Sequence, residues 1–188
     1  VRLDDVVGID DIKRDVLEVV DLLREPGRAA ALGIAPPHGL LFAGAPGTGK
    51  TMLAQAMANE AGVPFYALAG SDFESMWRGE PSRRLRAVYT QARRHPAAIV
   101  FVDEIDAIGA ARSSGPGVLR DDNTTVDALL VELDGFGSTT VLTIGATNNV
   151  NQLDPALLGP GRFDRVLTFG LPEHASRRPI LVRHLLKR

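Results

Sequence analysis

The segment from Gly44 to Thr51 reads G-A-P-G-T-G-K-T and matches the phosphate-binding pattern G-x-x-x-x-G-K-[ST]. The apolar run Gly39–Gly44 precedes it, and the helical pattern Lys50–Ala61 follows it. In this strand–turn–helix context the glycines let backbone N–H groups converge on phosphate oxygens at the positive end of the helix. A glycine- and proline-rich turn without a ligand is the alternative, and it requires a chance match in a chain with only three lysines. The pattern therefore predicts an α/β domain that binds a nucleotide.

Short apolar runs alternate with helical patterns along the chain. Strands of nearly continuous apolar residues, separated by helices, are typical of a parallel sheet that is buried on both faces. We therefore predict a three-layer α/β fold with a five-stranded parallel sheet and helices on both faces. The expected strands are Gly39–Gly44, 63–68, 98–103, 141–147 and 166–170, and the expected helices are 9–24, Lys50–Ala61, 82–94, Asp121–Leu133 and one beginning near Ala175.

Two carboxylates follow the apolar run 98–103, where Asp103 is directly succeeded by Glu104. A buried strand carries acids only at its exposed carboxyl end, which is where open α/β sheets bind their ligands. Together with Lys50 on the phosphates and the Thr51 hydroxyl on Mg²⁺, Asp103 would hold the metal and Glu104 would polarise the attacking water. The alternative is that both acids only cap a strand, and the neighbouring phosphate-binding pattern makes hydrolysis the better interpretation.

Two later segments add further candidates. The run 141–147 ends before Asn148, whose amide can contact a γ-phosphate or orient water without adding charge, although Asn148-Asn149 is also ordinary turn chemistry. Arg162 and Arg165 lie three residues apart after a proline-containing loop. They could stabilise phosphoryl charge on a neighbouring subunit, or they could form a surface pair with Asp164.

Composition excludes several classes of protein. The 21 basic and 23 acidic residues leave a net charge of −2, which gives no electrostatic footprint for nucleic acid or an anionic membrane. The absence of cysteine excludes disulfides and thiolate sites. The apolar stretches are far shorter than the ~18 residues that span a bilayer. A length of 188 residues fits one domain.

Three longer strings resemble the AAA family of ATPases, and most closely its FtsH-type branch. They are L-D-P-A-L-L-G-P-G-R-F-D-R at 153–165, D-E-I-D-A-I-G at 103–109 and L-L-V-E-L-D-G-F at 129–136. The resemblance extends from Val6 to about Val182, which is nearly the whole chain. It implies ATP as the nucleotide and Mg²⁺ as the metal.

The resemblance also assigns roles to residues. Asn148 resembles the nucleotide sensor, Arg162 and Arg165 resemble arginine fingers that act on a neighbouring subunit, and residues 134–136 resemble an inter-subunit signalling motif. The implied catalytic set is Lys50, Asp103, Glu104, Asn148, Arg162 and Arg165, with Thr51 and Asp103 on the metal. The implied nucleotide-binding set is Val7, Gly8, Pro46, Gly47, Thr48, Gly49, Lys50, Thr51, Met52, Asn148 and Ile180.

By the same resemblance the chain would form a homohexameric ring that uses ATP to pull polypeptides through a central pore. Trp77, Arg78 and Gly79 resemble the pore loop, with the tryptophan ring gripping the substrate; the alternative is a structural tryptophan.

The implied function is the motor of an FtsH-like membrane protease. Alternatives are an unfoldase of the valosin-containing type, which the Glu80-Pro81 departure favours, and a nucleic-acid remodelling ATPase. Asn149 and Gly159 also depart from the FtsH pattern near the expected subunit interface.

The resemblance places residues 1–188 in the large nucleotide-binding subdomain, with the helical lid beginning at about 175–188 and otherwise absent. The four histidines never form the H-E-x-x-H pattern of a zinc protease, so peptidase activity is expected in another part of a longer protein. We expect a soluble domain. We further expect that any membrane anchor lies outside this chain and that it holds the domain in the cytoplasm or an organelle matrix.

Overall fold

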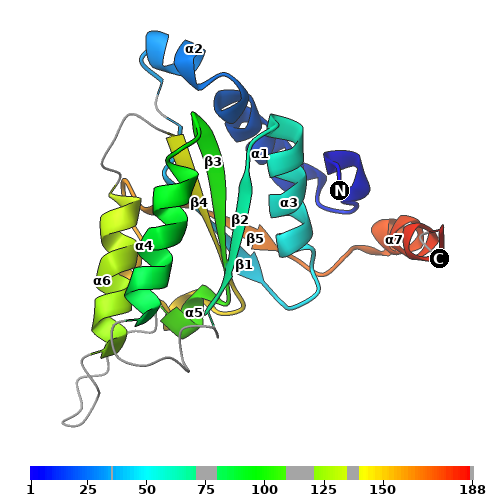
Figure 1. The fold of residues 1–188 in the computed structure, drawn as a ribbon. Helices are drawn as coiled ribbons and strands as arrows, with labels where there is room; N and C mark the ends of the chain where they lie inside the picture. The colour runs from blue at the N-terminus through cyan, green and yellow to red at the C-terminus, as the bar shows by residue number, and fades with distance from the viewer. Residues whose placement is uncertain (35, 71–79, 109–120, 135–139, 187–188) are drawn as a thin grey trace.

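A computed structural model describes residues 1–34, 36–70, 80–108, 121–134 and 140–186. Within these ranges helices and strands alternate from the first strand onward (Figure 1). In chain order the elements are η1 Leu3–Asp5, α1 Asp10–Arg24, α2 Pro26–Ala31, β1 Gly39–Gly44, α3 Lys50–Ala61, β2 Phe65–Ala69, α4 Glu80–Ala92, β3 Ala97–Asp103, α5 Ile105–Ile108, α6 Asp121–Leu133, β4 Thr140–Thr147, η3 Val150–Gln152, η4 Pro155–Leu157, β5 Phe163–Phe169 and α7 His174–Leu186.

The five described strands form one sheet in the order β2-β3-β4-β1-β5, and every neighbouring pair is parallel. All strands therefore point the same way, and their ends gather at two opposite edges. We call the edge where the strands end the carboxyl edge and the opposite one the amino edge. The predicted five-stranded parallel sheet is confirmed, and the order places β3, β4 and β1 side by side at the centre.

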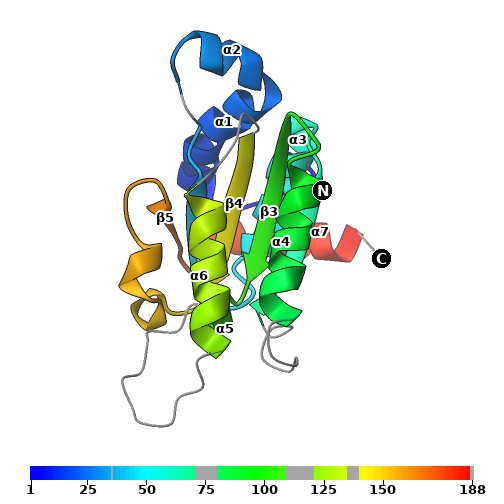
Figure 2. The ribbon, with the colours of Figure 1, turned by 60° about the vertical axis from the view of Figure 1, so that its left-hand side comes forward.

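Side chains of the central strands point alternately to the two faces of the sheet and pack into two separate hydrophobic cores. On β1, Leu40 and Phe42 point toward α1 and α3, whereas Leu41 points toward α4 and α6, and all three are at most 1% exposed. Figure 2 shows α4 and α6 side by side on one face of the sheet, with α1 and α3 behind it. Because both faces are covered, the strands read as continuous apolar runs, as predicted.

One buried polar contact ties the α4 layer to the sheet. The Tyr89 hydroxyl of α4 lies 2.7 Å from the Thr143 hydroxyl of β4, and both residues are about 1% exposed. Burial raises the pKa of Tyr89, so the phenol stays protonated. Directly after this helix, Arg93 pairs with the half-buried Glu132 of α6 and lies over the Tyr89 ring. These contacts fix the orientation of the two helices on this face.

Several element bounds differ from the predicted ones. The last strand begins at Phe163 rather than 166, because Phe163 is 1% exposed and pairs with Gly39, which anchors the start of β5 in the core. The second strand begins at Phe65 and extends to Ala69, because its pairing with β3 runs from Ile99 to Asp103. Helix α4 occupies 80–92 instead of 82–94, and α7 begins at His174.

Helix α7 stands apart from the three layers, beyond an extended linker after β5 (Figure 1). It packs instead against the N-terminal segment before α1. A Cβ atom at Gly8 would lie 2.8 Å from the Ser176 Cβ, so the backbone at Gly8 approaches α7 closely. Among the described helices, none combines the length and apolar character that crossing a bilayer requires.

Candidate active site at the carboxyl edge

The turn between β1 and α3 has the backbone that its glycines predict. Gly47 and Gly49 adopt positive φ angles of 77° and 97°, in the left-handed region that glycine enters at little cost. The Thr48 hydroxyl donates to the Ala45 carbonyl at 2.8 Å and closes the turn. Helix α3 then begins at Lys50, with Gly49 as its N-cap. The free N–H groups of its first turn therefore face the loop, which makes an anion-binding site.

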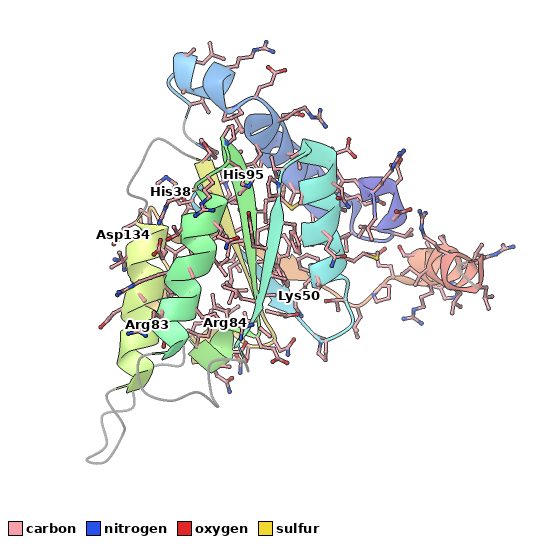
Figure 3. The ribbon with its side chains drawn as sticks, in the orientation of Figure 1. His38, Lys50, Arg83, Arg84, His95 and Asp134 are labelled. Atoms are coloured by element: carbon pink, nitrogen blue, oxygen red, sulfur yellow. The ribbon has the colours of Figure 1, made fainter. Side chains whose placement is uncertain are left out.

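Lys50 lies in this turn at the carboxyl edge, and Figure 3 labels it near the start of α3. Its ammonium donates to the Gly44 carbonyl at 2.6 Å, to the Ala45 carbonyl at 3.1 Å and to the Asn148 side-chain oxygen at 3.0 Å. The residue is only 8% exposed, and burial lowers the pKa of Lys50, an effect that Asp103 and Asp106 partly oppose. A negatively charged ligand would therefore stabilise the charged form of the Lys50 ammonium, which burial disfavours.

The two predicted acids stand where β3 ends. Asp103 accepts from the Thr51 hydroxyl at 3.3 Å and from the Glu104 backbone N–H at 3.0 Å. Glu104 has φ of 49°, which is rare for a residue with a side chain, and its side chain is exposed. Left-handed backbone at a non-glycine position costs free energy and is concentrated at functional sites. The turn therefore leaves Glu104 exposed beyond the carboxyl edge of the sheet, where it lines the pocket.

The hydroxyl–carboxylate pair of Thr51 and Asp103 suits Mg²⁺, which takes one or two protein oxygens and completes its shell with water and phosphate. Over the part of the chain that the structure describes, no cluster of three or more His, Cys, Asp or Glu residues forms a self-sufficient metal cage. The donor set thus fits a metal that arrives with a polyphosphate.

Asn148 lies at the end of β4, between the strands that carry Asp103 and the phosphate-binding turn. Its side-chain oxygen accepts from Lys50, which places the amide beside the ammonium. The next residue, Asn149, has a different role: its backbone N–H donates to Thr147 and its side chain accepts from the Asn151 N–H, both within the turn. Of the two adjacent amides, only Asn148 contacts the site.

These residues border one pocket of about 450 Å³, within the range typical of small-ligand sites. Val7 and Ile180 line it as predicted, whereas Gly8 does not and instead packs against Ser176. Asp5 and Arg183 were not predicted, since neither belongs to a recognisable pattern. The complete lining is Asp5, Val6, Val7, Pro46, Gly47, Thr48, Gly49, Lys50, Thr51, Met52, Asp103, Glu104, Asn148, Ile180 and Arg183.

Arg162 lies at the opposite, amino edge, because Phe163 pairs with Gly39 at the start of β1 while the phosphate-binding turn follows the end of β1. Six residues of strand separate the two ends by roughly 15 Å. Arg162 donates to both oxygens of Asp134, at 2.8 and 3.2 Å, and to the Ala156 carbonyl at 2.6 Å. Figure 3 labels Asp134 at the end of α6, well apart from Lys50 near the start of α3. The bond from Arg162 lowers the pKa of Asp134.

Arg165 is exposed on the edge strand β5, next to Leu40 in register. The alternative prediction was a surface ion pair between one of the two arginines and Asp164. Arg162 instead pairs with Asp134. The structure thus does not bring either arginine to the pocket of its own chain.

Two expected motifs lie outside the described residues. They are the pore loop, with Trp77, Arg78 and Gly79, and the part of the signalling motif formed by Gly135 and Phe136.

A residue that the sequence reasoning missed is Gly70, directly after β2. A Cβ atom built at this position would lie 2.1 Å from the Glu104 carbonyl oxygen and 3.1 Å from the Ala107 Cβ. No side chain fits there without moving the backbone that holds Glu104. Its place after the strand that neighbours β3 is the signal that could have identified it.

We expect Gly70→Ala to lower kcat for ATP hydrolysis by about tenfold or more, because misplacing a catalytic group by about an ångström is costly. ATP affinity should change little, since the phosphate-binding turn is untouched. Steady-state ATPase assays with ATP titrations separate the two effects. Gly27→Ala is the matched control, because that glycine has no atom within 4 Å of the added methyl and an ordinary φ. Equal rates for both variants would mean that the Gly70 contact does not position Glu104.

Comparison with known proteins adds an independent observation. The model of the "ATPase family associated with various cellular activities (AAA)" matches residues 40–171, and a model of magnesium chelatase subunit ChlI matches the shorter segment 14–61. Similar proteins include the ATP-dependent zinc metalloproteases FtsH of Veillonella parvula and Photobacterium profundum and FtsH 1 of Sphaerobacter thermophilus. The identities are 47%, 49% and 48%, over 98%, 97% and 96% of this chain. The chain spans only 29%, 27% and 28% of these relatives.

Proposed function

The chain belongs to the AAA family of ATPases. From this premise we propose that it hydrolyses ATP with Mg²⁺ in the pocket at the carboxyl edge. The observation that carries this assignment is the convergence of Lys50, Thr51, Asp103 and Asn148 through direct hydrogen bonds. These groups lie at or directly beyond the ends of three neighbouring strands, β1, β3 and β4. Such convergence is what phosphoryl transfer requires, because its catalysis is mostly positioning and charge stabilisation.

In this proposal each residue has a distinct task. The N–H groups of Gly47 to Thr51 and the Lys50 ammonium bind the phosphates, and Thr51 and Asp103 hold Mg²⁺. The metal supplies charge neutralisation on the phosphate oxygens when bound. Asn148 orients the attacking water, and Glu104 accepts its proton as the water oxygen bonds to the γ-phosphorus and the bond to ADP breaks. Val7 and Ile180 contact the base, with Gly8 holding α7 beside them.

We further propose that Arg162 and Arg165 act on the pocket of a neighbouring subunit in a ring. Supporting this, Arg162 lies at the amino edge, one strand length from its own pocket. Asp134 and the Ala156 carbonyl hold its guanidinium in place before any partner arrives. Arg165 is exposed on an edge strand, where a neighbour could reach it.

The biological role that we propose is the ATP-driven motor of an FtsH-like protease that unfolds protein substrates. It rests on the similarity to FtsH zinc metalloproteases and on the family resemblance of the sequence motifs, and it places the protease and any membrane anchor in other segments of a longer protein. Trp77, Arg78 and Gly79 would form the substrate-gripping loop of a homohexamer. Residues 1–188 would be the large nucleotide-binding subdomain, with α7 as the start of the lid.

A mixing experiment tests the composite site. Arg162→Ala and Glu104→Gln should each lower the ATPase rate, the arginine change on the order of 1000-fold by analogy with arginine fingers supplied in trans. Mixed in equal amounts, the two inactive proteins should regain activity. The reason is that the Glu104→Gln subunits supply Arg162 to the intact pockets of the Arg162→Ala subunits.

The double variant Arg162→Ala/Glu104→Gln is the matched control, since mixing it with Arg162→Ala leaves no arginine at this position in any subunit. Activity should also rise with protein concentration as rings assemble. A wild-type rate in Arg162→Ala, or no recovery in mixtures that light scattering shows to be assembled, would contradict action in trans.

A further inference from the structure

The side chain of Phe163 lies on the sheet face that α4 and α6 cover, and it extends from β5 across β1 to β4. The residue is 1% exposed. A Cβ atom built at Gly39 of β1 would lie 2.9 Å from the Cδ1 atom of the ring, and one built at Gly145 of β4 would lie 3.1 Å from its Cζ atom. The ring therefore rests directly on the backbone of two glycines in neighbouring strands.

Above Gly145 the ring meets the residue that follows Glu104 in the chain. Ile105 is fully buried in the same core, and its Cδ1 atom would lie 2.8 Å from a Cβ atom at Gly145. Ile105 and the Phe163 ring thus share the space that a side chain at Gly145 would fill. The left-handed backbone of Glu104 is strained, and such strain persists only where the surrounding packing holds it. The buried Ile105 side chain supplies part of that packing.

The other end of the ring lies beside the backbone of Arg162. The Arg162 carbonyl oxygen would lie 2.6 Å from a Cβ atom at Gly39, which is closer than a side chain permits. Phe163 pairs with Gly39, and the register between β1 and β5 shifts directly after this pair. Irregularities of this kind change the direction in which nearby side chains point. The contact at Gly39 therefore fixes the point from which the Arg162 side chain extends to Asp134.

We propose that Phe163 is a positioning residue for two catalytic groups at once. Through Ile105 it holds the turn of Glu104 in its own pocket, and through its backbone it holds Arg162 for the pocket of the neighbouring subunit. This inference rests on the proposed composite site. A close-packed core leaves its side chains no room to shift separately. Glu104 and Arg162, although they lie at opposite edges of the sheet, can therefore not be repositioned independently.

The mixing experiment described above separates the two effects. Phe163→Leu keeps the side chain apolar and removes the part of the ring that reaches Gly145. In Arg162→Ala subunits, which contribute pockets only, this change reports on Glu104. In Glu104→Gln subunits, which contribute arginines only, it reports on Arg162.

Each modified subunit is mixed with its unmodified partner and compared with the parent mixture of Arg162→Ala and Glu104→Gln. Both mixtures should lose about tenfold in kcat, because displacing a catalytic group by part of an ångström is costly. The KM for ATP should stay unchanged, since the ring does not touch the phosphate-binding turn. Gly145→Val fills the same space from the opposite side and should reproduce both losses.

Phe101→Leu is the matched control, because Phe101 is equally buried but belongs to the core on the other face of the sheet. It should lower the melting temperature to a similar extent and leave both mixtures at the parent rate. Thermal melts verify that each variant is folded. A loss in only one of the two mixtures, or in neither, would overturn the shared positioning. If the parent mixture itself regained no activity, action of Arg162 in trans would fail and this inference with it, so the parent mixture tells the two failures apart.

Discussion

Glu104→Gln is expected to bind ATP with nearly unchanged affinity and to lose most of its turnover, by about 100-fold or more, as for other general bases. The substitution keeps the size of the side chain and removes the group that accepts the proton of water. The exposed position of Glu104 shows that the carboxylate is not required for packing. Folding should therefore be unaffected.

The measurement is a steady-state ATPase rate beside an ATP-binding titration on the same preparation. Glu18→Gln, on the exposed face of α1, is the matched control for loss of one carboxylate and should behave as wild type. Near-normal hydrolysis by Glu104→Gln would show that another group takes the proton. Asp106, whose buried Oδ1 has no partner among the described residues, would be the next candidate.

Lys50→Ala should weaken nucleotide binding by about 100-fold or more, as expected for removing one partner of a desolvated charge pair. In the free protein the ammonium is held by two loop carbonyls and by Asn148, already in the position where phosphate oxygens would arrive. Alanine leaves the turn without its cation. The acids Asp103 and Asp106, whose charges act on Lys50, would then repel a polyphosphate.

The scarcity of lysine gives this test a clean control. Lys13→Ala removes an ammonium on α1 whose described partner is the exposed Asp10, so ATP affinity should stay unchanged. Titration of ATP or ADP against both variants decides the matter. Wild-type affinity in Lys50→Ala would contradict the assignment of the phosphate site and, with it, the proposed function.

Much of the site was predictable because short patterns encode local geometry. The turn 44–51 carries its own loop conformation, and acids at the end of a buried strand have only one edge at which to lie. Because parallel strands end together, the sequence was sufficient to place Asp103, Asn148 and Lys50 at one edge. The five-stranded sheet followed from the same apolar runs.

What the sequence did not predict depends on contacts between distant segments. Gly70 matters only because β2 lies beside β3, so its backbone meets that of Glu104. Asp5 and Arg183 are separated by most of the chain and meet only when α7 folds back to the N-terminal segment. The start of β5 was misplaced because Asp164 and Arg165 look like a loop, whereas burial of Phe163 makes them part of a strand.

The placement of Arg162 and Lys50 at opposite ends of β1 has a genetic consequence if rings form as proposed. A subunit that lacks Arg162 would keep a sound pocket of its own and disable the one next to it. In a cell that carries one normal and one altered gene, every mixed ring would contain at least one such junction. If one disabled pocket stalls the whole ring, mutations at the amino edge would be dominant, and their severity would rise faster than the share of altered subunits.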